Sequence, residues 1–226
     1  MAATLLSNVE YNSIPTLQEA AAAVKSFQVT QDMMLFGDIF LKHLMHDTWG
    51  LSLVHRHFDL KPNEIMLEQP VNRDAKTVTK AVEVSKVVAP LTGSNYRFQE
   101  DGKLLAFEYR YHSDATLQEV LQNERFLAFL CDLKQTIAET GLDNVLGLTP
   151  VESTKPGLET TNYENRENIV EPLADGTPML SDYVTAVWAF NESGPGVQRG
   201  CRWVTMCQLW TDSNGNPRHT SGAHMS

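Results

Sequence analysis

The amino-acid sequence predicts an α+β fold: a single domain, residues 1–226, built on a mostly antiparallel, curved sheet of about seven strands. Helical spacing of apolar residues is confined to the N-terminal region and to one long central segment. Elsewhere, apolar residues recur at every second position, which is the spacing of half-buried strands. No Gly- or Pro-rich linker divides these strands, so one domain is favoured over two.

Three helices are expected, at residues 17–27, 31–47 and 116–140. Thr16 and Glu19 have the spacing of a capping box at the start of the first helix. The second helix is apolar around most of its circumference, which predicts that other elements cover it. Thr116 and Glu119 form a second capping box, and Gly141 follows the third helix, where a left-handed residue is favoured.

Strands are expected at residues 51–60, 64–69, 78–88, 96–100, 103–112, 183–191 and 201–210, with 145–151 as a further candidate. The first two are joined by a turn at Pro62, and Asp101 with Gly102 provides the turn of a hairpin. Residues 152–178 show no apolar periodicity, which predicts a long irregular loop of a functional or flexible kind. A flexible tail is expected from about residue 212.

The composition limits the partners of the protein. Eighteen basic and twenty-eight acidic residues give a net charge of −10, which disfavours nucleic acid and anionic membrane surfaces as partners. The N-terminus lacks the pattern of a secretory signal, and no apolar stretch is long enough to span a membrane. Cys131, Cys201 and Cys207 form no C-x-x-C pair and are expected to be small buried residues with reduced thiols. A cytoplasmic protein with a small-molecule partner is therefore expected, and its oligomeric state is left open.

The candidate site begins with His55-x-His57-x-Asp59, which alternation along residues 51–60 places on one face of a strand. Two imidazoles at this spacing can converge on one ion, and a carboxylate completes a ligand set typical of Zn or non-haem Fe. The candidate metal ligands are His55, His57, Asp59 and Glu64. Alternation along residues 103–112 likewise predicts a shared polar face. The candidate catalytic residues are His55, His57, Glu108, Arg110 and His112.

Three interpretations of this pattern remain open. The first is a metal centre, and the second is a metal-free pocket in which a histidine acts as general base and Arg110 stabilises an anion. The third is a solvated stripe on a half-buried strand. The predicted function is an intracellular enzyme that acts on a small organic molecule, with metal dependence in the first case. The alternative is a non-catalytic, acidic interaction protein whose His55 and His57 face solvent.

Overall fold

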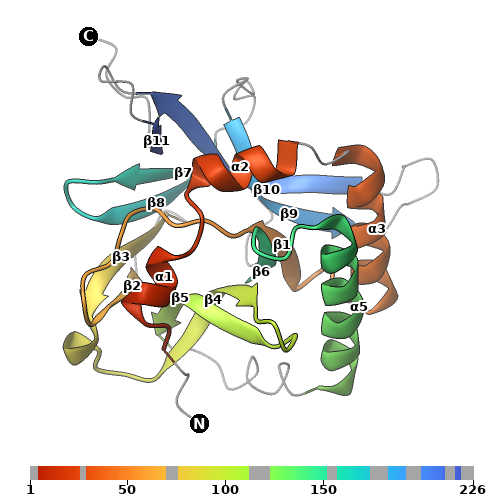
Figure 1. Ribbon diagram of the computed structural model, residues 1–226, viewed down its shortest axis with the longest axis horizontal. Coiled ribbons are helices and arrows are strands. Elements are labelled where there is room, and N and C mark those ends of the chain that lie inside the picture. The colour runs from red at the N-terminus through yellow and green to blue at the C-terminus, as the bar shows by residue number, and fades with distance from the viewer. Residues whose placement is uncertain are drawn as a thin grey trace.

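Ten strands close into a barrel in the computed structural model of the protein (Figure 1). The structure describes residues 5–25, 29–69, 76–111, 123–151, 157–173, 183–191, 200–211 and 217–219. Around the barrel the strands follow the order β1, β9, β10, β7, β8, β3, β2, β5, β4 and β6, and β6 pairs with β1 to close the ring. An eleventh strand, β11, pairs only with β10. The β2–β5 and β7–β10 pairs are parallel, and the other eight pairs of the ring are antiparallel.

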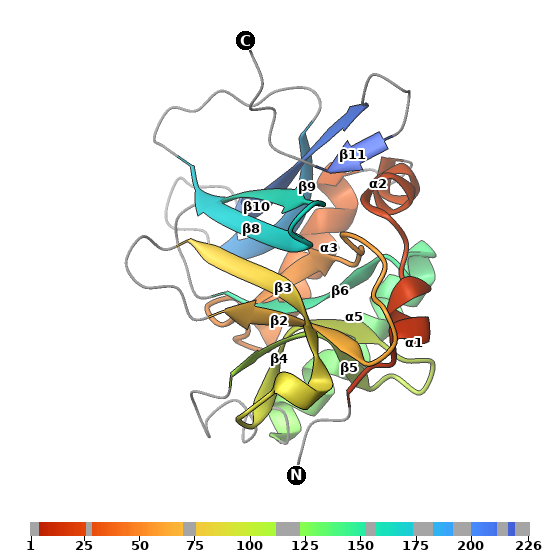
Figure 2. The same cartoon turned by 90° about the vertical axis from the view of Figure 1, so that its left-hand side faces the viewer.

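The strands have these bounds: β1 Trp49–Leu53, β2 Glu64–Gln69, β3 Thr77–Glu83, β4 Leu91–Phe98, β5 Leu104–Tyr111, β6 Leu146–Pro150, β7 Gly157–Asn162, β8 Glu167–Pro172, β9 Tyr183–Asn191, β10 Gly200–Thr211 and β11 Pro217–His219. Figure 2 shows β8, β3 and β2 following one another along the wall of the barrel. Strands that are consecutive in the sequence form four of the ten pairs of the ring, namely β2–β3, β4–β5, β7–β8 and β9–β10, and the other six pairs join strands that are distant in the sequence.

Helices cover the outside of the barrel. Their bounds are α1 Asn8–Asn12, α2 Leu17–Lys25, α3 Val29–Lys42 and α5 Glu124–Thr140, with a short 3-10 helix, η1, at Val84–Lys86. The helices α3 and α5 lie side by side against one flank of the barrel (Figure 1). Phe40 of α3 packs 4.9 Å from Phe129 of α5 and 4.7 Å from Phe190 of β9, as ring centroids. The largest apolar core therefore lies between the helices and the outer wall of the barrel.

The predicted α+β fold with an antiparallel sheet of about seven strands is wrong, because the sheet is mixed and closes on itself. The difference arises mainly in the segment predicted to be an irregular loop, which contains β7 and β8. In β7 the buried positions are occupied by Gly157, Glu159 and Thr161, so the strand alternates without an apolar face. A search for apolar residues at every second position detects strands with an apolar face, and it misses a strand whose inner face is polar.

The predicted helix boundaries differ from those observed. The second helix ends at Lys42 and not at residue 47, because Leu44 adopts a left-handed φ of 56° and Met45 N–H donates to the Phe40 carbonyl at 2.8 Å. The third helix begins at Glu124 with Asn123 as its N-cap, and the predicted cap residues Thr116 and Glu119 lie outside the described residues. The predicted tail from residue 212 contains β11.

Several local signals are confirmed. Glu19 Oε2 accepts a hydrogen bond from the Thr16 backbone N–H at 2.7 Å, and the Glu19 N–H donates to Thr16 Oγ1 at 3.3 Å. Gly102 turns the β4–β5 hairpin with φ 84°, and Gly141 caps α5 with φ 70°. In the part of the chain that the structure describes, every helix is too short or too polar to cross a membrane.

Candidate metal centre

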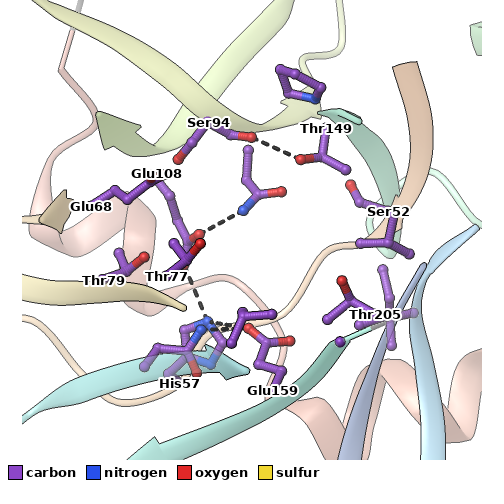
Figure 3. Close-up of a pocket in the computed structure, with 18 of the residues that line it drawn as sticks. Ser52, His57, Glu68, Thr77, Thr79, Ser94, Glu108, Thr149, Glu159 and Thr205 are labelled. Carbon is purple, nitrogen blue, oxygen red and sulfur yellow. Dashed lines mark hydrogen bonds and ion pairs between the residues drawn. The ribbon is translucent and has the colours of Figure 1, made fainter. Parts of the chain in front are cut away.

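The interior of the barrel holds a cavity of about 210 Å³. All ten strands of the ring contribute lining residues, together with His55 and His57, which follow β1. Figure 3 shows Ser52, Glu108 and Glu159 around this space, on different strands. The cavity is therefore the lumen of the barrel, and small barrels of this kind can enclose one small ligand.

His55 and His57 lie just beyond the end of β1 and not on a strand that runs to residue 60. After Leu53 the chain leaves the β6 ladder, and the Arg56 N–H donates to the Pro15 carbonyl at 2.8 Å. The two imidazoles nevertheless face each other edge-on, with ring centroids 5.0 Å apart. Each histidine is 5% exposed, so the predicted solvated stripe is not what the structure contains.

The backbone orients His55 as a ligand. Its Nδ1 lies 2.9 Å from the Leu53 carbonyl oxygen, which can only accept, so Nδ1 carries the proton. The Nε2 atom then presents its lone pair to the interior, 3.7 Å from Glu159 Oε2 and 3.8 Å from Cys207 Sγ. Burial lowers the pKa of His55, although the nearby Glu159 carboxylate opposes this effect. A neutral imidazole with an inward-facing Nε2 is the form that binds a metal.

His57 meets two carboxylates at one nitrogen. Its Nε2 lies 3.2 Å from Glu108 Oε1 and 3.3 Å from Glu159 Oε1. Burial acts to lower the pKa of His57, but the Glu159 and Glu108 carboxylates outweigh burial and raise it. Two buried carboxylates this close to a single nitrogen repel each other, and a cation placed between them relieves that repulsion.

Amide and thiol groups hold the two carboxylates. Asn168 Nδ2 donates to Glu159 Oε1 at 2.5 Å, and the Cys207 thiol donates to Glu159 Oε2 at 2.7 Å. Asn95 Nδ2 donates to Glu108 Oε2 at 2.6 Å. Burial and the Glu159 charge raise the pKa of Cys207, which keeps this thiol protonated as a donor. The carboxylates thus have fixed orientations, as the second shell of a metal centre requires.

The separations between these atoms fit one ion. Ligand atoms about 2 Å from a tetrahedral centre lie roughly 3.3 Å from one another. The observed contacts of Nε2 atoms with carboxylate oxygens range from 3.2 to 3.7 Å. One ligand atom each from His55, His57 and Glu159 lie within 4.8 Å of one another. This buried group can hold a metal ion.

The structure separates the predicted site residues into two sets. His55, His57 and Glu108 converge, and Arg110 lines the same cavity. Asp59 instead pairs with Arg56 Nε at 2.9 Å and has a side chain that is 70% exposed.

Glu64 is held elsewhere by a two-pronged ion pair with Arg166, with both N–O distances 2.7 Å. His112 lies outside the described residues.

Two residues of the site, Glu159 and Cys207, were absent from the candidates that the sequence suggests. Glu159 lies in β7, within the predicted loop, and its only signal is the polar alternation with Thr161. Cys207 is buried, as predicted, but it acts as a donor to Glu159. Cys131 is exposed, contrary to the prediction of a buried residue.

Comparison with known proteins gives no match from which a function could be inferred, so a proposed function must rest on the geometry of this centre. No protein-family model, curated protein or solved structure matches the chain.

Proposed function

We propose that the lumen of the barrel is a metal-dependent active site for a small organic molecule, with the metal held by His55, His57 and Glu159. The observation that carries the proposal is the convergence of both Nε2 atoms on buried carboxylate oxygens at the wall of the barrel cavity. Structural metal sites have four protein ligands and no free space beside them, whereas catalytic sites keep a position open. Here three ligands adjoin a cavity, which supports a catalytic centre.

The donor set supports Zn or non-haem Fe as the metal. Two imidazoles with one carboxylate form the ligand set of the facial triad of non-haem Fe(II) enzymes and of several catalytic Zn sites. When bound, either ion supplies Lewis acidity and activates water, and iron also activates dioxygen.

Glu108 and Arg110 are proposed to act on the substrate. Glu108 Oε2 is fixed by Asn95, and its Oε1 faces His57, so the carboxylate is positioned as a proton acceptor beside the metal. Arg110 lines the same cavity and carries a permanent positive charge. Its proposed role is to stabilise an anion that develops on the substrate.

Metal content tests the proposal. The full-length protein, purified without chelator, is expected to contain close to one equivalent of Zn or Fe by elemental analysis. After chelation, it should bind Zn²⁺ or anaerobic Fe²⁺ with one-site stoichiometry in calorimetry. Absence of saturable binding for both ions would reject the metal centre. The metal-free alternative would then be favoured, because His57 bonded to Glu108 has the geometry of an oriented general base.

Metal affinity is expected to fall in mild acid, because a proton on His57 Nε2 competes with the ion. The folded pKa of His57 is raised above 6.5, so the stability that its protonation gives the metal-free protein is present below pH 6.5 and lost as the pH rises through the folded pKa. Metal binding follows the opposite course and strengthens as that proton leaves. His55, with a lowered pKa, stays neutral throughout this range.

Calorimetric titrations at several pH values check this prediction. The expected loss approaches tenfold per pH unit below the folded pKa of His57, with one proton released per ion bound. An affinity that is constant between about pH 6 and pH 8 would contradict it.

A further inference from the structure

Hydroxyl and amide groups dominate the polar wall of the barrel cavity beyond the metal centre. They belong to different strands and surround the space, as Figure 3 shows for several of them. The hydroxyls are those of Ser52, Thr77, Thr79, Ser94, Thr149 and Thr205, and the amides are those of Asn95 and Asn168. A hydroxyl both donates and accepts, so this wall matches a ligand that also carries several groups able to do both.

Ser52 provides an independent sign of a missing ligand. It is 2% exposed and lines the cavity, yet its Oγ has no hydrogen-bond partner among the described residues. Buried hydroxyls are paired in most proteins, and an unpaired one needs an explanation. A ligand hydroxyl within the cavity would complete this bond.

The charges of the cavity favour an uncharged ligand. Three carboxylates line it, those of Glu68, Glu108 and Glu159, and one guanidinium, that of Arg110. One divalent cation together with Arg110 balances these three carboxylates, so no positive charge is left over for an anionic ligand. This step rests on the proposed metal centre, since without the cation the cavity is net negative.

The size and the apolar part of the wall limit the ligand further. A cavity of about 210 Å³ is smaller than the roughly 300–1,000 Å³ that hold drug-sized ligands. Leu53, Phe107 and Val170 provide apolar surface between the hydroxyls. Such patches accept the C–H faces of a ring or a short carbon chain whose hydroxyls point outward.

We propose that the cavity binds a small, neutral polyhydroxylated compound of the sugar or polyol class, with Ser52 as one of its hydrogen-bonding partners. The cavity volume corresponds to a single ring or a short chain, and the metal centre lies at the wall of the same cavity.

Binding is tested on the full-length protein, both metal-loaded and chelated, with D-xylose, D-glucose, xylitol and myo-inositol as neutral probes. D-gluconate serves as the anionic probe and 1,6-hexanediol as the apolar one. At least one neutral probe is expected to raise the melting temperature of the loaded protein in a saturable way. The anionic and apolar probes are expected to leave it unchanged.

Ser52→Ala is expected to lower the affinity for the neutral probe that binds best by about tenfold, which corresponds to the loss of one hydrogen bond. Because the Ser52 hydroxyl is unpaired without ligand, the same variant should keep or raise the melting temperature of the ligand-free protein. A serine with only a structural role would instead lower it. The matched control is Ser85→Ala, whose side chain lies on the exposed η1 helix outside the cavity and should change neither value.

The outcomes separate this inference from the proposed function. A protein that binds metal but responds only to gluconate or hexanediol, or to no probe, overturns the ligand class and leaves the metal centre intact. A protein that binds no metal but responds to a neutral probe, with Ser52→Ala weakening it, supports the ligand class and rejects the metal centre.

Discussion

Replacement of His57 by alanine should abolish tight metal binding and leave the barrel folded. The Nε2 atom of this residue lies at the point where Glu108 and Glu159 meet, 3.2 Å and 3.3 Å from their nearest carboxylate oxygens. Second-shell groups alone alter metal affinity by about ten- to a hundredfold, so loss of a ligand should cost at least about a hundredfold. His55→Ala should have an effect of similar size.

Chelator competition and elemental analysis measure the loss, and circular dichroism follows the fold. The alanine variant leaves two carboxylates facing each other, which can destabilise the protein by itself. A double variant, His57→Ala with Glu108→Gln, removes one of these charges and should remain folded without binding metal.

Asp59→Asn and Glu64→Gln are the matched controls. Both carboxylates follow the histidine pair closely in the sequence, but they are bonded to Arg56 and Arg166 outside the cavity. Each control should bind metal as the unmodified protein does. If the controls lose metal as His57→Ala does, or if both histidine variants retain it, the ligand assignment is wrong.

Replacement of Phe126 by alanine should lower the free energy of unfolding by about 3–5 kcal/mol, the usual cost of emptying a large buried aromatic site. Phe126 is completely buried between α5 and the barrel, with ring centroids 5.1 Å from Trp49 and 5.8 Å from Phe129. Because Trp49 begins β1, this contact also anchors the strand that leads to the histidines.

Urea unfolding, monitored by circular dichroism, gives the loss of stability. The control is Leu127→Ala at the next position of the same helix, where the side chain is 52% exposed, and its effect should stay within about 0.5 kcal/mol. Equal losses at the two positions would show that α5 does not pack on the barrel through Phe126.

Local signals in the sequence predicted local structure well. The Thr16–Glu19 capping box, the turn at Gly102 and the left-handed cap at Gly141 each depend on residues within a few positions of one another. The last predicted strand pair also coincides closely with β9 and β10. These features can be predicted from the sequence because residue propensity and backbone conformation depend on only a few neighbouring residues.

The candidate site could be predicted only in part, because the sequence signals reach only over a few residues. The spacing of His55 and His57 indicated that both imidazoles can converge, and the structure brings them together with Glu108, a candidate on another strand. The spacing could not select the carboxylate, because nearness along the chain is not nearness in space. Arg166, 102 residues after Glu64 in the sequence, pairs with Glu64 outside the site.

By itself, the sequence predicted the three longer helices α2, α3 and α5, although not their boundaries, together with most of the strands and the histidine pair. The tertiary structure alone decided that the sheet closes, since closure depends on pairing β7 and β8, whose buried positions show no apolar period. That same closure places Glu159 and Cys207 beside His55. A strand with a polar face looks like a loop in the sequence, because it lacks alternating apolar residues. Only the closed barrel places that polar face inside a site.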